Sequence, residues 1–318
     1  MKYTVVITSE LPPVAMQMLA GEFDVVSHPS EGVRTEEEMV TILAEADGAI
    51  TLLSDPLTRR VLESNSNLRI VANYAVGYNN VDLDAARELG IVVTNTPGVL
   101  TEATADLTMA LILAVTRRVA EGDAYVRRTG LVAWAPLAWL GSSLQGRQLG
   151  VIGMGRIGFA TATRARAFGM SVAYSGPTAR PESERQHESR RVALDELLTT
   201  SDIVSVHCPL NEETRHLVDD AALGRMKPSA FLINTSRGAM VDESALCDAL
   251  ENRQIAGAGL DVFEDEPHVG ERLRSFSNVV LLPHIGSATF ETRSEMARIA
   301  ASNVQAVLRG RSPITPVG

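Results

Sequence analysis

The chain has 318 residues, 45% of them hydrophobic and 21% charged, with a formal net charge of −10. Its length suits two domains of about 150 residues each, and its acidic balance disfavours a surface for nucleic acid or anionic lipid. The longest apolar run, residues 109–115, is far shorter than the roughly 20 residues of a membrane-spanning helix. Since there is no signal-peptide pattern and there are only two cysteines, we expect a soluble cytoplasmic protein without a membrane segment, disulfide framework or metal site.

The first 98 residues alternate β-branched runs with helical patterns, which is typical of βαβ units around a parallel sheet. A helix is predicted from the acidic turn at Glu36 to Ala46. After the turn at Pro97-Gly98, residues 101–119 predict a long and mostly buried helix between two domains. The predicted strands of this first part are residues 2–8, 23–28, 48–53, 69–75 and 91–96.

A second alternating series begins at Leu149 and predicts a doubly wound sheet of at least six strands. Its predicted strands are residues 149–153, 171–175, 202–208, 230–235, 255–262 and 278–283, with helices at 156–168, 194–200 and 243–252. A last helix, residues 288–309, is expected to pack back on the first domain. The prediction is therefore an α/β protein with two doubly wound parallel sheets, one domain comprising residues 1–98 and 288–318 and the other 99–287.

A glycine motif follows the first strand of the second series and precedes a helix. It has the form G-x-G-x-x-G and consists of Gly153, Met154, Gly155, Arg156, Ile157 and Gly158. The tight turn, the close approach of a pyrophosphate and the helix packing each require a missing side chain at one of the glycines. The helix N-terminus adds backbone N–H groups for the phosphates. The second domain is therefore predicted to be a Rossmann dinucleotide-binding domain.

The residues after the next strand bear on the choice of cofactor. Sites for NAD usually place Asp or Glu there to bind the ribose 2′-hydroxyl, but residues 159–181 contain no acidic residue. The positions that would leave room for a 2′-phosphate are Ser175, Thr178 and Arg180. Gly176 and Pro177, in the same loop, are also expected to bind the cofactor. We expect NADP as cofactor, with NAD possible; the alternative is that Arg180 is a solvated loop arginine.

Three further segments follow strands of the second sheet, at the edge where parallel sheets bind ligands. They are Asn234-Thr-Ser-Arg237-Gly, Asp261-Val-Phe-Glu-Asp-Glu266-Pro and Pro283-His284-Ile-Gly-Ser-Ala-Thr289. Together with NYAVGYNNVD from residue 73, NTPGVLTEATAD from residue 95 and the glycine motif, they make the sequence resemble the D-isomer-specific 2-hydroxyacid dehydrogenases. Within that family it is most similar to glyoxylate/hydroxypyruvate reductases. The resemblance implies a flavodoxin-like substrate domain, with a cleft between the two domains.

The resemblance implies NAD(P)H-dependent reduction of a small 2-oxo acid to the D-2-hydroxy acid. This reaction needs a hydride, a proton donor and a cation for the carboxylate. By resemblance, His284 donates the proton, Glu266 orients and charges the imidazole, and Arg237 binds the substrate oxygens. The alternatives are that Arg237 is a surface charge, that Glu266 belongs to a solvent-facing acidic run, and that His284 is a hydrogen-bonded structural residue. Two rival functions remain open: 3-phosphoglycerate dehydrogenase and a dinucleotide-sensing corepressor.

Other site residues are implied by the resemblance and by simple geometry. Successive N–H groups of Val76 and Gly77 could hold the substrate carboxylate. Asp261 is expected to accept a hydrogen bond from the carboxamide of the cofactor, and the Cys208 thiol to be inert. The remaining residues expected around the cofactor are Thr104, Cys208, Pro209, Thr214, Thr235, Ser236 and Gly286.

Residues 130–141, GLVAWAPLAWLG, are apolar and contain both tryptophans, Trp134 and Trp139. Exposed apolar loops commonly mark interfaces, and the resemblance implies a dimer arm here. We therefore expect a homodimer; the alternative is that both indole rings are buried within their own subunit.

Overall fold

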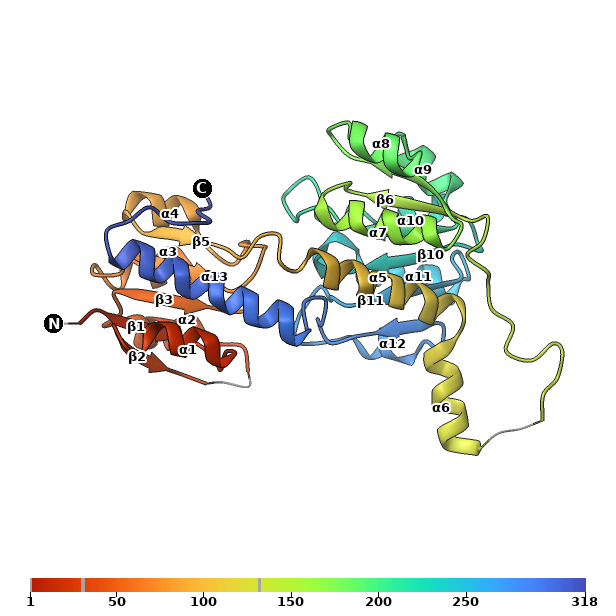
Figure 1. The fold of residues 1–318 in the computed structure, drawn as a ribbon. Helices are drawn as coiled ribbons and strands as arrows, with labels where there is room; N and C mark the ends of the chain where they lie inside the picture. The colour runs from red at the N-terminus through yellow and green to blue at the C-terminus, as the bar shows by residue number, and fades with distance from the viewer. Residues whose placement is uncertain (1, 30–31, 131–132) are drawn as a thin grey trace. The chain divides into compact units, whose positions relative to one another are not determined.

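The computed structural model of the chain describes residues 2–29, 32–130 and 133–318. It forms two compact units (Figure 1). Unit 1 combines Met1–Leu100 with Ser287–Gly318, and unit 2 is Thr101–Gly286. Each unit is a parallel sheet with helices on both faces, which confirms the predicted α/β class with two doubly wound sheets.

Unit 1 contains, among its described residues, five parallel strands in the order β2-β1-β3-β4-β5. They are β1 (Thr4–Ile7), β2 (Asp24–Ser27), β3 (Gly48–Thr51), β4 (Ile70–Asn73) and β5 (Val92–Thr94). This is the strand order of flavodoxin-like sheets, in which ligands bind beyond the carboxyl ends of the strands near the switch in direction. The loops after β1, β3 and β4 lie at that edge.

Alternating residues of these strands build the two apolar faces of unit 1, as the period of two in a strand requires. Val5 and Ile7 pack with two helices on one face, and Val6 packs with three helices on the other. The first face carries α1 (Pro13–Leu19) and α13 (Phe290–Leu308). The second carries α2 (Glu36–Leu43), α3 (Arg59–Glu63) and α4 (Leu83–Glu88). The C-terminal helix α13 therefore completes the core of a unit whose strands come from the start of the chain.

Unit 2 contains, in the part that the structure describes, seven parallel strands in the order β12-β11-β10-β9-β6-β7-β8. Six of them match the predicted strands, and the additional one is the two-residue β8 at the edge. The strands are β6 (Gln148–Ile152), β7 (Ser171–Ser175), β8 (Arg190–Arg191), β9 (Ile203–Val206), β10 (Phe231–Asn234), β11 (Gly257–Leu260) and β12 (Val279–Leu281).

The helices of unit 2 cover both faces of its sheet (Figure 1). One face carries α5 (Thr101–Thr116) and α7 (Arg156–Ala167). The other carries α9 (Leu194–Thr200), α10 (Asp220–Arg225), α11 (Glu243–Glu251) and α12 (Glu271–Ser275). The helix α8 (Pro181–His187) joins β7 to β8. Helices packed on both faces therefore support the strands that carry the predicted site residues of unit 2.

A further helix, α6 (Val119–Thr129), has no buried residue and stands away from the sheet of its unit (yellow in Figure 1). The predicted helix 101–119 is therefore shorter than expected, because Arg118 adopts a left-handed backbone conformation with φ of 56° that breaks it. Within the described ranges, no helix combines the length and the apolar character needed to cross a membrane.

Candidate active site

The glycine turn at residues 153–158 connects β6 to the N-terminus of α7. Gly153 has φ of +95°, and a Cβ there would lie 2.6 Å from the backbone nitrogen of Cys208. A Cβ on Gly158 would lie 2.5 Å from the carbonyl oxygen of Gly153, whereas one on Gly155 would meet nothing within 4 Å. Two of the glycines are thus required by the protein's own packing, and the third leaves open space beside a helix N-terminus. These features fit the pyrophosphate of a dinucleotide.

The loop after β7 is held by an arginine that the sequence analysis missed. Arg191 of β8 donates hydrogen bonds from Nη2 to the carbonyl oxygens of Gly176 and Pro177, each at 2.9 Å. Ser175 ends β7, and the side chain of Arg180 is exposed. Arg191 lies in a polar run whose two-residue strand gives no recognisable pattern, so only the three-dimensional structure could place it.

The arginine loop follows β10 and is fixed by its own backbone contacts. Asn234 donates a hydrogen bond from Nδ2 to the carbonyl oxygen of Arg237 at 2.8 Å, and Nη1 of Arg237 donates to the carbonyl oxygen of Ser236 at 2.7 Å. A Cβ on Gly238 would lie 1.8 Å from the carbonyl carbon of Phe263. Glycine is therefore required where this loop meets the loop after β11.

The predicted acid and imidazole are in direct contact. Nδ1 of His284 lies 2.8 Å from Oε2 of Glu266, and Oε1 of Glu266 accepts a hydrogen bond from the backbone nitrogen of Phe263 at 2.9 Å. Within the described part of the chain, Nε2 of His284 has no hydrogen-bond partner. His284 also has φ of 55°, in the left-handed region that residues with a side chain adopt only occasionally. The arrangement leaves Nε2 as the atom that can exchange a proton with a ligand.

The charges of the site support one another. Burial would raise the pKa of Glu266, but the hydrogen bond and the charge of His284 outweigh it and hold this pKa below its ordinary value. Burial lowers the pKa of Arg237, and the nearby Glu266 carboxylate opposes this shift. A guanidinium stays charged in proteins. At neutral pH the Glu266 carboxylate and the Arg237 guanidinium are therefore both charged, and the imidazole of His284 contacts the carboxylate.

Asp261, at the end of β11, positions the histidine loop. Its side chain is 1% exposed, Oδ1 accepts a hydrogen bond from the nitrogen of Ile285 at 2.8 Å, and Oδ2 accepts one from the nitrogen of Gly286 at 2.7 Å. Burial raises the pKa of Asp261 despite these bonds. This positioning contact was not part of the sequence analysis; contact with a cofactor carboxamide stays a prediction.

Threonines connect helix α5 to these loops. Oγ1 of Thr104 donates to the carbonyl oxygen of Gly286 at 3.1 Å, and Oγ1 of Thr108 lies 3.0 Å from Oγ1 of Thr235. The sequence analysis named Thr104, Thr235 and Gly286 but not Thr108, which lies one helical turn after Thr104. The structure therefore brings these three predicted cofactor residues to one edge of the unit 2 sheet.

The remaining predicted cofactor residues lie in the loops after β9 and β10. Ser236 donates a hydrogen bond from Oγ to the carbonyl oxygen of Cys208 at 2.7 Å, and Thr214 donates one to the carbonyl oxygen of Pro209 at 2.7 Å. Burial raises the pKa of the Cys208 thiol to about 11, so it stays protonated and unreactive. Burial lowers the pKa of the neighbouring His207 to about 4, so this imidazole is neutral at physiological pH.

Val76 and Gly77 belong to unit 1, in the loop after β4. The carbonyl oxygen of Val76 accepts a hydrogen bond from Nδ2 of Asn95, and that of Gly77 accepts one from Nδ2 of Asn73, both at 2.8 Å. Among the described residues, neither amide N–H donates to another group. Two successive unused N–H groups can bind an anion.

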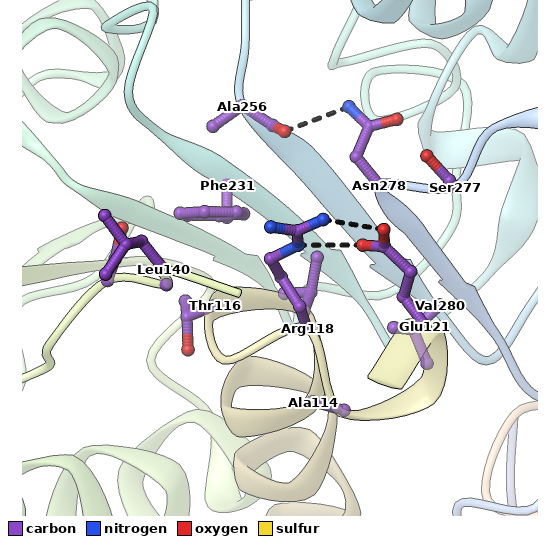
Figure 2. Close-up of a pocket in the computed structure, with 13 residues that line it drawn as sticks. Ala114, Thr116, Arg118, Glu121, Leu140, Phe231, Ala256, Ser277, Asn278 and Val280 are labelled. Atoms are coloured by element: carbon purple, nitrogen blue, oxygen red, sulfur yellow. Dashed lines mark hydrogen bonds and ion pairs between the residues drawn. The ribbon is translucent and has the colours of Figure 1, made fainter. Parts of the chain in front are cut away.

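A cavity of about 360 Å³ in unit 2 lies beside the end of α5. None of the predicted site residues lines it. Figure 2 shows that its charged groups neutralise each other, because the guanidinium of Arg118 donates to both carboxylate oxygens of Glu121 at 2.8 and 2.6 Å. The structure contains no group of three or more His, Cys, Asp or Glu residues, within the ranges described, that could hold a metal ion.

The tryptophan segment is partly described, since residues 131 and 132 lie outside the described ranges. Trp134 is 86% and Leu137 82% exposed, so the alternative that both rings are buried is wrong for Trp134. Trp139 is 41% exposed, and its ring lies 4.8 Å from the ring of Tyr125 and beneath the guanidinium of Arg118.

Comparison with known proteins agrees with this geometry. Residues 109–286 match the family model described as D-isomer specific 2-hydroxyacid dehydrogenase, NAD binding domain. The chain is 46% identical to a glyoxylate reductase of Thermococcus litoralis over 98% of its own length and 96% of that protein. A crystal structure of a Thermus thermophilus protein has a TM-score of 0.93 and 46% identity, covering 99% of this chain and 100% of that one.

A second solved structure carries a cofactor. It is an NADPH-dependent glyoxylate/hydroxypyruvate reductase of Sinorhizobium meliloti in complex with NADP and malonate, with a TM-score of 0.85 and 35% identity over 100% of this chain and 97% of that one. With its glycine turn, its paired carboxylate and imidazole and these similarities, the chain belongs to the D-isomer-specific 2-hydroxyacid dehydrogenase family, whose members are oxidoreductases that act on CH–OH groups with a nicotinamide dinucleotide.

Proposed function

We propose that this protein reduces a short 2-oxo acid, glyoxylate or hydroxypyruvate, to the D-2-hydroxy acid. The observation that carries the proposal is the contact of 2.8 Å between Nδ1 of His284 and Oε2 of Glu266, which leaves Nε2 available as the proton donor. Its support among known proteins includes the glyoxylate reductase of Thermococcus litoralis, which is 46% identical to this chain.

The proposed mechanism assigns one task to each side chain. His284 donates a proton from Nε2 to the carbonyl oxygen, and Glu266 stabilises the imidazolium before transfer. Arg237 binds the carbonyl and carboxylate oxygens through its planar fork. The N–H groups of Val76 and Gly77 hold the substrate carboxylate. A bound nicotinamide cofactor supplies the hydride.

The same proposal assigns the dinucleotide to unit 2. The turn at residues 153–158 would hold the pyrophosphate, with Gly155 providing the open approach. Asp261 would accept from the carboxamide with the lone pairs that the loop amides leave unused. The residues proposed to line the nicotinamide side are Thr104, Cys208, Pro209, Thr214, Thr235, Ser236 and Gly286.

We propose NADP as the preferred cofactor. Its support is the absence of an acidic residue from 159 to 181, together with Ser175, Thr178 and the exposed Arg180 after β7. Steady-state kinetics with both cofactors test this point, and R180A should lower kcat/KM for NADPH while leaving that for NADH nearly unchanged. A tenfold preference of the native enzyme for NADH would overturn it.

An absorbance assay at 340 nm with a panel of 2-oxo acids tests the activity. The native enzyme should be most active on glyoxylate or hydroxypyruvate. H284A should lose about 10² to 10⁴ in turnover, the range for a positioned general acid, while cofactor affinity measured by fluorescence titration changes little. Full activity of H284A would refute the proposed proton donor.

We also propose a homodimer formed through the arm, defined as α6 and residues 133–141. The support is its composition, since α6 has no buried residue and Trp134, Leu137 and Leu140 are all strongly exposed. Light scattering coupled to size exclusion should give twice the chain mass of 34.1 kDa. A single species at the chain mass would contradict the proposal.

A further inference from the structure

We propose that the side-chain amides of Asn95 and Asn73 hold the turn 75–77 in the one orientation that binds the substrate carboxylate. They are positioning residues, and the inference rests on the proposed function. It concerns unit 1 alone and starts from the hydrogen bonds of three consecutive carbonyl groups.

All three carbonyl oxygens of this turn accept hydrogen bonds from unit 1. The nitrogen of Thr96 donates to the carbonyl oxygen of Ala75 at 2.9 Å. Nδ2 of Asn95 donates to Val76 and Nδ2 of Asn73 to Gly77, each at 2.8 Å. The turn thus has no carbonyl free to swing outward.

The direction of each carbonyl fixes the direction of the next amide. A trans peptide is planar, and its C=O and N–H bonds point in opposite directions. Binding the Ala75 carbonyl therefore orients the N–H of Val76, and binding the Val76 carbonyl orients the N–H of Gly77. Since the carbonyl oxygens of Ala75 and Val76 accept from unit 1, the N–H groups of Val76 and Gly77 point away from those donors, and neither N–H donates within the described residues. The Asn95 amide thus controls one of the two donors directly.

The asparagines are themselves held in place. Asn73 is fully buried, and its Oδ1 accepts from Nδ2 of Asn80 at 3.3 Å. Nδ2 of Asn80 also donates to the carbonyl oxygens of Leu52 and Asp55, at 3.1 and 3.0 Å. These bonds connect the ends of β3 and β4, so the Asn73 amide has little freedom to rotate.

Asn95 is anchored by the C-terminal segment. It is 8% exposed, its nitrogen donates to the carbonyl oxygen of Thr315 at 3.2 Å, and its carbonyl oxygen accepts from Oγ1 of Thr315 at 2.6 Å. Asn303 of α13 in turn accepts from the nitrogen of Thr315 at 3.1 Å. A site built in this way loses little entropy when an anion binds, which favours affinity.

A purely structural role would give a different result, and Asn65 provides the control. It is 5% exposed and donates from Nδ2 to the carbonyl oxygens of Leu43 and Ala46, at 2.7 and 2.8 Å. Its partners belong to the α2–β3 connection and not to the turn. N65A therefore removes a comparable buried amide without touching the turn.

The experiment compares N95A, N95S and N73A with N65A in the full-length protein. We expect N95A to raise KM for glyoxylate about ten- to a hundredfold, because one hydrogen bond to a charged group would be misdirected. The KM for NADPH should be unchanged, and kcat should change much less. Asn73 orients only the peptide that follows Gly77, so N73A should act more weakly. The dissociation constant of oxalate, measured calorimetrically with cofactor present, should rise in parallel.

N95S provides a second test in case N95A does not fold. Serine keeps a polar group, but its side chain is one bond too short to reach the Val76 carbonyl. N65A should lower the thermal midpoint without changing either KM. Unchanged glyoxylate KM and oxalate affinity in folded N95A or N95S would overturn the inference while the native activity stands. A native enzyme that reduces no 2-oxo acid would instead overturn the proposed function, and this inference with it.

Discussion

The imidazole of His284 and the carboxylate of Glu266 meet through Nδ1 and Oε2 at 2.8 Å, and the other carboxylate oxygen accepts the backbone N–H of Phe263. The acid is thus fixed at both oxygens and presents the histidine in one orientation. Since Glu266 comes from the loop after β11 and His284 from the loop after β12, neighbouring strands of one sheet set the distance between them.

Replacing Glu266 by Gln should remove the negative charge and one of the two contacts. The amide has a single acceptor oxygen, so either Nδ1 of His284 or the backbone N–H of Phe263 loses its acceptor. We expect turnover to fall about tenfold or more at neutral pH, within the range of general acid contributions. Steady-state kinetics of the native enzyme and E266Q measure this, and thermal melts check that the variant is folded. Native turnover in folded E266Q would show that the reaction does not need this carboxylate.

The same pair predicts how stability depends on acidity. The pKa of Glu266 lies below its ordinary value of 4.5, so ionisation stabilises the folded state above that pH. The contribution disappears as the pH falls through the lower folded value. We therefore expect the difference in free energy of unfolding between the native protein and E266Q, measured with urea, to be largest above about pH 5. The difference should shrink as the pH falls. A gap that widens toward low pH would contradict this sign.

Asp261 should be sensitive to an isosteric change. D261N replaces one acceptor by a donor that faces a backbone N–H, so either Ile285 or Gly286 loses its partner. We expect a loss of about 1 to 3 kcal/mol in the free energy of unfolding and a fall in kcat, because the His284 loop is displaced. Thermal melts and steady-state kinetics check both effects. D248N, at an exposed position of α11 that is paired with Arg272, is the control.

The glycine turn predicts different outcomes for two alanine variants. G155A should fold normally and weaken cofactor binding, because its Cβ meets no protein atom but occupies the open space. G158A should destabilise the protein itself, since its Cβ would lie 2.5 Å from the carbonyl oxygen of Gly153. Fluorescence titration with NADPH and thermal melts distinguish the two. G224A, another position with open space, should change neither cofactor affinity nor folding; strong binding by G155A would argue against the assigned site.

The sequence was sufficient for every described strand except β8 and for the motif segments from which the candidate site is built. Buried runs such as Val5–Ile7 and Ile70–Ala72 are apolar because helices cover both faces of a parallel sheet. The helices α1, α3, α4, α8, α10 and α12 were missed, since five to seven residues give only a weak helical repeat, although the seven residues of α9 were recognised. Helix α6 was missed for another reason: no residue in it is buried, so no apolar face marks it.

The contacts that position the site could not be predicted from sequence. Gly238 is required by the backbone of Phe263, 25 residues away, and the Asn95 amide by its contact with the carbonyl oxygen of Val76. Side-chain amides are common and can bond to any nearby carbonyl. Their partners depend on the tertiary structure, which no local pattern encodes.

The anion site proposed at Val76 and Gly77 consists of backbone amides, which neither gain nor lose a proton in any ordinary buffer. Its contribution to holding the carboxylate would therefore be insensitive to acidity, whereas proton delivery by an imidazole depends on pH. A change in cellular pH would then act on the reaction step and leave this part of substrate binding unaltered.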